Sequence, residues 1–140
     1  MATSSLTYAP STSPSRVWTA RVVTAIPVLF LLVDGGMKVV LAQPVIDAMP
    51  TIGWPVSLAR TIGIILLACL AVYLHPRTAV LGAILLTGFL GGAVATQLRV
   101  GNPLVSNVLF PVYVAVLLWG GLYLRDARLR ALIPFRGPDA

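Results

Sequence analysis

Two opposite charges, Asp34 and Lys38, lie within an otherwise apolar stretch of the sequence, "FLLVDGGMKVVLAQ" (30–43). The two residues are four positions apart, so on a helix both side chains lie on one face. The acid also precedes the base, which is the favourable order for an ion pair. An unpaired charge at the centre of a bilayer costs about 3 kcal/mol on insertion scales. Pairing lowers that cost, and a pair that faces a polar cavity can hold the polar group of a ligand.

The elements that position this pair are predicted to be membrane-spanning helices. The chain has 140 residues, of which 58% are hydrophobic and only 10% charged, so it has too little polar surface for a soluble globule. A bilayer core about 30 Å thick needs about 20 apolar helical residues. The sequence therefore predicts an all-α integral membrane protein, an up-down four-helix bundle with spans at about 17–42, 56–74, 78–98 and 108–124.

The segments outside the predicted spans are polar or basic. Residues 1–16 are rich in Ser, Thr and Pro and are predicted to form a disordered tail, whereas residues 125–140 form a basic C-terminal segment. Cytoplasmic loops of membrane proteins carry an excess of Lys and Arg, so the more basic side of the bundle should be cytoplasmic, with both termini on it. That side holds Arg16, Arg21, Arg77, Arg125, Arg128, Arg130 and Arg136, and the other side holds Lys38, Arg60 and Arg99.

With this topology, polar residues gather near the outer ends of the spans. In one interpretation they form a pocket, open to the outer face, for the head of a quinone or lipid. In the other, Asp34 pairs with Lys38 or Arg60 to hold the bundle together, while Arg99 extends to lipid phosphates. The short apolar loop 44–55 is expected to cap this region. The candidate pocket residues are Asp34, Lys38, Arg60, Gln97, Arg99 and Asn107.

Other kinds of functional site lack the residues that they need. The single cysteine, Cys69, excludes an internal disulfide or a dithiol couple. The single histidine, His75, precedes Pro76 in a short loop, the chain has no glutamate, and its aspartates are dispersed, so we predict neither catalytic residues nor a metal site. The cations that give a net charge of +6 are scattered between apolar stretches, which argues against nucleic-acid binding.

Two further stretches are predicted to form contact surfaces. In "LTGFLGGAVATQLRVGNP" (86–103), Gly88 and Gly92 are four positions apart, with Gly91 beside them, and this spacing lets another helix approach closely. We expect this face to pack inside the bundle, with a helix of another protein as the alternative. Arginines alternate with apolar residues in 125–134, which favours contact with lipid or with an acidic partner through Arg125, Arg128 and Arg130.

The sequence resembles that of the DoxX-like family. The resemblance rests on Gly36 and Lys38 after the first span, on "HPRTAVLGAILLTGFLGGAVATQLRVGNP" (75–103) and on "LLWGGLYLRDARLRALIP" (117–134). It implies a four-helix protein of the bacterial inner membrane, with relatives linked to quinone-coupled or oxidative-stress redox complexes. Family members with this third-span pattern commonly carry a histidine at the position of Gln97 and a glutamate near Leu66. Neither is present here, which argues against proton-coupled chemistry.

The residues and the resemblance together favour a non-catalytic accessory or structural membrane subunit. In this interpretation the chain has no intrinsic cofactor and packs against a larger, redox-active or photosynthetic membrane complex. The alternative is a quinone- or lipid-binding subunit of an oxidoreductase or isomerase, with its polar pocket near the outer face. Membrane lipids are expected partners in both cases, and association into a homo-oligomer is open.

Overall fold

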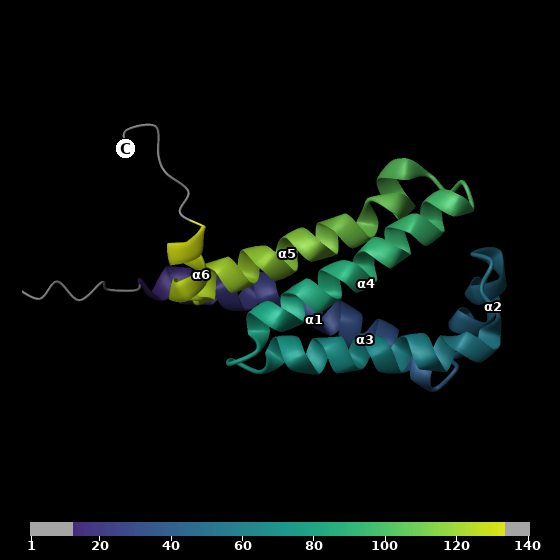
Figure 1. Ribbon diagram of the computed structural model, residues 1–140, viewed down its shortest axis with the longest axis horizontal. Coiled ribbons are helices and arrows are strands. Elements are labelled where there is room, and N and C mark those ends of the chain that lie inside the picture. Colours follow the sequence, from purple (N-terminus) through teal and green to yellow (C-terminus); the bar gives the residue numbers. More distant parts are fainter. Residues whose placement is uncertain (1–12, 134–140) are drawn as a thin grey trace, which may run out of the picture.

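The computed structural model describes residues 13–133, and these residues form a bundle of helices without strands (Figure 1). Four stretches of the described chain are long and apolar enough to cross a membrane, as predicted: Pro14–Val40, Val56–Leu74, Ala79–Arg99 and Leu104–Arg125. The long helices are α1 (Pro14–Val39), α3 (Ala59–Leu74), α4 (Ala79–Arg99) and α5 (Phe110–Arg125). The short elements are α2 (Gln43–Thr51), the 3-10 turn η1 (Val56–Leu58), the π-helical turn η2 (Leu104–Val108) and α6 (Ala127–Leu132).

Both ends of α1 differ from the predicted span 17–42. The helix begins at Pro14, inside the segment predicted as a tail, because proline is well suited to the first turn of a helix. It ends at Val39, and Leu41 just beyond has a φ of 54°, which a continuing right-handed helix does not allow. The rest of the predicted tail, residues 1–12, and residues 134–140 lie outside the described residues.

The four long helices form a ring in which α1 and α4 each pack against α3 and α5. Figure 1 shows that the helices lie close together at one end and diverge toward the other end, where α2 lies. The first end holds the start of α1, the 75–78 loop and α6, and is called here the arginine-rich end. The opposite end is called the α2 end.

Glycines bring pairs of helices into close contact. A Cβ added to Gly63 of α3 would lie 2.8 Å from the carbonyl oxygen of Gly35 in α1. One added to Gly82 of α4 would lie 2.2 Å from the Cα of Tyr73 in α3. The backbones can approach this closely only because the side chains are absent, so van der Waals packing holds the helices together. The buried apolar core around these contacts includes Leu31, Leu66, Leu70, Leu86, Leu118 and Leu122.

Two hydrogen bonds connect helices across the bundle. The buried Tyr73 hydroxyl donates to the carbonyl oxygen of Leu118 at 2.8 Å, which joins α3 to α5. The indole N–H of Trp119 donates to Oγ1 of Thr87 at 2.8 Å, which joins α5 to α4. Each bond satisfies a polar side chain and joins two helices, so both favour this arrangement of the bundle.

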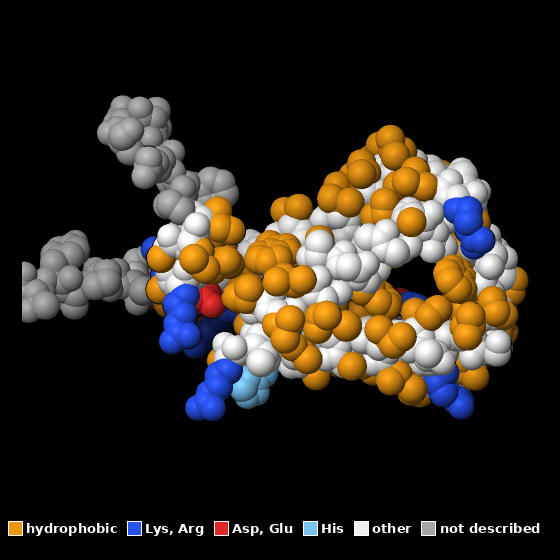
Figure 2. Space-filling model, in the orientation of Figure 1, with side chains coloured by type: hydrophobic (Ala, Val, Ile, Leu, Met, Phe, Trp, Pro, Cys, Tyr) orange, Lys and Arg blue, Asp and Glu red, His pale blue; other side chains and the backbone are white. Residues whose placement is uncertain are grey.

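The outer surface of the long helices is apolar. Figure 2 shows hydrophobic side chains over the length of the bundle and Lys and Arg side chains gathered toward its two ends. The exposed apolar residues include Leu29, Val33, Leu81, Ile84 and Val116. This distribution suits a surface that contacts lipid along its length and polar groups at both ends.

Candidate functional site

A cavity of about 460 Å³ opens where α4 and α5 diverge from α1 and α3. Figure 2 shows the hollow toward the α2 end, with acidic and basic side-chain atoms visible inside it. The cavity is lined by polar side chains from α1 and α4 and by a larger number of apolar and aromatic ones. We call it the Asp34–Lys38 cavity after the two charged residues that line it, Asp34 and Lys38.

The predicted ion pair is present on the α1 wall of this cavity. The Lys38 ammonium donates to Oδ1 of Asp34 at 2.5 Å, and the two side chains are 19% and 29% exposed, respectively. A lysine ammonium has three N–H donors, and a carboxylate accepts at several lone-pair positions. The pair therefore keeps both a donor and an acceptor for a further molecule.

Gln97 lies on the α4 wall of the same cavity. Its side-chain oxygen accepts a hydrogen bond from the Asn102 amide, and its own amide N–H groups have no partner among the described residues. Next to it, Oγ1 of Thr96 accepts from the indole N–H of Trp54 at 3.4 Å. The α4 wall thus offers a free donor and also holds an aromatic ring at the cavity.

Three of the six predicted pocket residues do not line this cavity. Nε of Arg60 donates to the carbonyl oxygen of Val39 at 3.1 Å, at the end of α1. Nη2 of Arg99 donates to the carbonyl oxygen of Ile52 at 3.0 Å. Oδ1 of Asn107 accepts a hydrogen bond from the hydroxyl of the serine before it. The two arginines bind backbone carbonyls because helix ends and turns leave these acceptors unsatisfied, and arginine has only donors to offer.

The 44–55 segment caps the cavity, as predicted. It contains α2, in which Val45 and Met49 are buried, and the turn that follows. Met49, Ile52 and Trp54 all line the cavity. The Arg99 guanidinium lies 6.0 Å from the centre of the Trp54 ring and donates a hydrogen bond to the turn that precedes Trp54. Through these two contacts α4 holds the cap in place.

The sequence analysis missed the phenylalanines of the cavity wall. Phe30, Phe89 and Phe110 come from three different helices, and the rings of Phe30 and Phe110 meet edge to face with their centres 5.0 Å apart. One signal was available, because Phe30 lies four residues before Asp34 and therefore on the same helix face. Whether Phe89 and Phe110 face the cavity depends on how α4 and α5 are rotated about their axes, which the sequence does not indicate.

The predicted packing of the α4 glycines inside the bundle is wrong. A Cβ added to Gly88, Gly91 or Gly92 would meet nothing within 4 Å. Gly88 and Gly92 line the cavity instead, and Gly91 is exposed. The reason is that this part of α4 lies where the helices diverge, so no backbone comes opposite it.

The predicted lipid or partner surface lies at the arginine-rich end. Oδ1 of Asp126 accepts from the backbone N–H of Arg128 at 2.8 Å and caps the start of α6. Nη1 of Arg130 donates to the carbonyl oxygens of Tyr123 and Leu124, at 3.0 and 2.7 Å. These bonds fold α6 back against the end of α5, with the Arg125 and Arg128 side chains exposed.

Comparison with known proteins shows the family. The sequence model of the DoxX-like family matches residues 22–121, a stretch that contains every residue lining the Asp34–Lys38 cavity. Searches of curated proteins and of solved structures found no match. The chain belongs to the DoxX-like family, and with its four apolar helices it is a multi-pass membrane protein.

Proposed function

We propose that this member of the DoxX-like family binds a small amphipathic molecule, a quinone or a lipid, in the Asp34–Lys38 cavity. One observation carries the proposal: a partly buried ion pair and a wall of aromatic rings share a single cavity of about 460 Å³. Small-molecule sites have volumes of about 300–1,000 Å³ and combine a mostly apolar lining with a few placed polar groups.

The polar groups of the cavity suit the carbonyl and hydroxyl groups of a quinone headgroup. Lys38 on α1 and the amide of Gln97 on α4 can each donate to a carbonyl oxygen. The carboxylate of Asp34 can accept from a hydroxyl, as in the reduced form of such a ring. Hydrogen bonds to charged groups contribute about 1.5–3 kcal/mol each, so this end of the cavity would orient the head of the ligand.

The apolar part of the cavity suits the ring and the tail of the same molecule. Phe30 and Phe110 form one wall, and Phe89 and Trp54 add aromatic surface from α4 and from the cap. Flat aromatic groups pack favourably against such rings. On the α4 side only glycine hydrogens face the cavity at Gly88 and Gly92, which leaves room for an apolar tail.

Quenching of the Trp54 fluorescence by decylubiquinone tests the proposal, because Trp54 lines the cavity. A Trp18→Phe/Trp119→Phe background removes the other two tryptophans of the chain. The purified protein in detergent should show saturable quenching. Asp34→Leu/Lys38→Met removes both charges together, so no unpaired charge remains. It should weaken binding at least about tenfold, because charge-assisted hydrogen bonds to the headgroup are lost.

A matched pair of substitutions controls for changes in polarity alone. Gln43 donates to Asp47 at 2.9 Å, four residues further along α2, and both side chains are exposed outside the cavity. Gln43→Met/Asp47→Leu should leave the midpoint of quenching unchanged. Decylubiquinone could quench Trp54 equally in both double variants and in the parent protein. That result would mean that the quinone only dissolves in the micelle, and the proposal would fail for quinones. Protection of Trp54 by a monoacylglycerol would identify a lipid head as the occupant.

A second proposal is that the protein is an accessory subunit of a larger, redox-active or photosynthetic membrane complex. The exposed face of α4 supports it. Gly91 is exposed and does not line the cavity, and a Cβ added there would meet nothing within 4 Å. Ile84 and Leu98, on the same helix, are both 55% exposed. A transmembrane helix of another protein can therefore approach α4 closely at this glycine.

Affinity purification in mild detergent tests the accessory role. Gly91→Leu places a bulky side chain on the open face of α4 and should reduce recovery of a partner subunit. Gly36→Leu is the matched control, since Gly36 on α1 also has nothing within 4 Å of an added Cβ. A stable lone monomer by native mass measurement, with nothing bound to the parent protein, would contradict this second proposal.

A further inference from the structure

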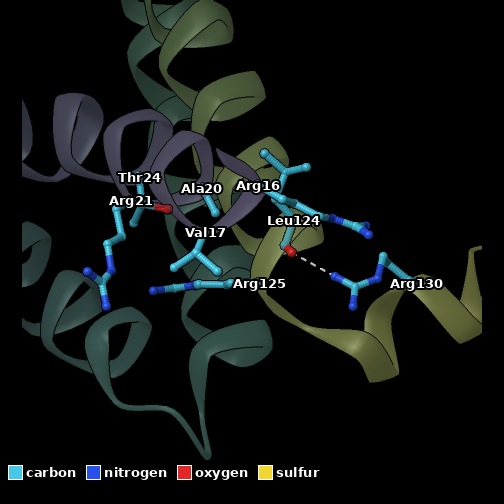
Figure 3. Close-up of a pocket in the computed structure, with 8 residues that line it drawn as sticks. All are labelled: Arg16, Val17, Ala20, Arg21, Thr24, Leu124, Arg125 and Arg130. Carbon is cyan, nitrogen blue, oxygen red and sulfur yellow. Dashed lines mark hydrogen bonds between the residues drawn. The ribbon is translucent and has the colours of Figure 1, made fainter. Parts of the chain in front are cut away.

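A second cavity, of about 340 Å³, lies at the arginine-rich end of the bundle, away from the Asp34–Lys38 cavity. Four arginines line it: Arg16 and Arg21 from α1, Arg125 from the end of α5, and Arg130 from α6. Figure 3 shows Arg21 and Arg125 extending toward one another on one side, with Arg16 and Arg130 on the other. We call this space the arginine cavity.

No carboxylate of the described residues lines the arginine cavity or forms an ion pair with its arginines. The one ion pair among residues 13–133 is that of Asp34 and Lys38, near the other end of the bundle. The side chains of Arg16 and Arg21 have no hydrogen-bond partner in this range, and Oδ1 of Asp126 accepts from two backbone N–H groups at the start of α6. Four like charges around one space repel each other, and an anion placed between them relieves that repulsion.

The other two arginines are held in position at the edge of the cavity. The guanidinium of Arg125 lies over the Tyr73 ring, 4.9 Å from its centre. Arg130 is anchored through a single nitrogen, Nη1, to two carbonyl oxygens at the end of α5. A guanidinium has five N–H donors, so both groups keep donors for a ligand while their position is fixed. Such preorganisation lowers the entropic cost of binding.

A buried threonine lies beside the same cavity. Thr24 on α1 is 9% exposed and contributes to the lining. Its Oγ1 is buried against α5, where a Cβ added to Gly121 would clash with it, and it lies beside the Tyr73 hydroxyl, which donates to the Leu118 carbonyl. The Thr24 oxygen therefore faces the contact of α1 with α5, and the arginines supply the polar groups of the cavity.

We propose that the arginine cavity binds a phosphate group, such as that of an anionic phospholipid or of a soluble phosphate compound. Guanidinium groups bind phosphate oxygens through paired N–H donors, which is the chemistry that the four arginines offer here. Val17 and Leu124 add apolar surface to the lining, and the residue after Val17 on α1 is the exposed Trp18. These neighbours favour the lipid as the carrier of the phosphate. The site is independent of the function proposed above.

Native mass spectrometry of the protein in a neutral detergent tests the site, with dioleoylphosphatidylglycerol as the probe. The Arg16→Gln/Arg21→Gln variant should fold normally, because both side chains are exposed and without partners in the described structure. A cation near an anionic lipid contributes a factor of about five in affinity, so loss of two should weaken lipid binding about 30-fold.

The matched control is Arg77→Gln/Arg128→Gln, which removes two charges at the same end but outside the cavity. We expect its affinity to stay within about threefold of the parent, because screening limits contributions from more distant charges. Equal losses in the two variants would indicate a diffuse surface attraction and overturn the proposal. So would equal binding of a diacylglycerol with the same acyl chains, which lacks the phosphate.

Inorganic phosphate distinguishes the two sources of the group. If it displaces the lipid from the parent protein, and binds the Arg16→Gln/Arg21→Gln variant more weakly, the cavity recognises phosphate alone and a soluble compound can fill it. If it does not displace a lipid whose binding requires these arginines, the phospholipid is the ligand. If neither probe depends on Arg16 and Arg21, the proposal is refuted.

Discussion

Replacing Gly82 with alanine should force α3 and α4 apart. Gly82 lies near the start of α4, and an added Cβ would be 2.2 Å from both the Cα and the nitrogen of Tyr73, and 2.7 Å from its Cβ. Two of these three atoms belong to the backbone and cannot rotate away. The helices are joined by residues 75–78 alone, so the loop offers little freedom to absorb the strain.

The expected cost follows from this geometry. Carbon atoms pack at about 3.5–4.0 Å, so the contact at Tyr73 would have to lengthen by more than about 1 Å. A gap of that size removes about a quarter to a half of the dispersion energy of each contact between α3 and α4. Overpacking typically costs about 1–3 kcal/mol, and a rigid backbone neighbour places Gly82→Ala at the upper end. We expect the free energy of unfolding to fall by about 3 kcal/mol.

Titration with sodium dodecyl sulfate, followed by far-UV circular dichroism, measures this change. Gly91→Ala is the matched control, because it makes the same substitution on the same helix where the added Cβ meets nothing within 4 Å. It should be neutral or stabilising by up to about 1 kcal/mol, since alanine is the better helix former. Identical midpoints for the two variants would refute the close contact of α3 and α4.

Three further substitutions test other contacts. Tyr73→Phe removes the hydroxyl that donates to the Leu118 carbonyl, and the same titration should show a loss of about 1 kcal/mol in the free energy of unfolding. No loss would mean that the bond does not form. Arg99→Gln removes the bond to the Ile52 carbonyl, so amide hydrogen exchange should accelerate at residues 52–54 and not at the arginine-rich end. Asp126→Ala removes the cap of α6, which should cost about 1 kcal/mol and speed exchange in 127–132 alone.

The spans could be predicted from the sequence because length and hydropathy limit what crosses a bilayer. The predicted range 56–74 coincides with the apolar stretch Val56–Leu74 of the structure. Local backbone geometry was beyond such reasoning. Leu41 stops α1 with a positive φ, a conformation that is uncommon for leucine and that no pattern in the sequence indicates. The π-helical turn Leu104–Val108 is a similar case.

Within the site, predictability depended on the length of the side chain and the range of the contact. The Asp34–Lys38 pair follows from the geometry of a single helix. Arg60 and Arg99 were expected in the pocket, but both donate to backbone carbonyls outside it. These acceptors are formed by helix ends and turns, and the sequence alone does not indicate which of them a long side chain reaches.

The arginine cavity was missed because its members are far apart in the chain. Arg16 and Arg21 served only as a signal of orientation, whereas Arg125 and Arg130 were assigned to a lipid or partner surface of the C-terminal segment. An antiparallel bundle does place the start of the first span and the end of the last at one end. That reasoning brings Arg16 and Arg125 near each other, but only the contact of α1 with α5 makes them neighbours.

The distribution of glycines explains why the bundle is open where the Asp34–Lys38 cavity lies. Gly82 joins α4 closely to α3 toward the arginine-rich end, and further along α4 Gly88 and Gly92 face a void. On α3, Gly63 lies against the other side of the cavity wall, where an added Cβ would be 2.7 Å from Cβ of Lys38. This contact fixes the backbone that carries the ion pair, so the polar wall is in place before any ligand arrives. The proposed ligand would therefore need little reorganisation of the protein in order to bind there, which lowers the cost of binding.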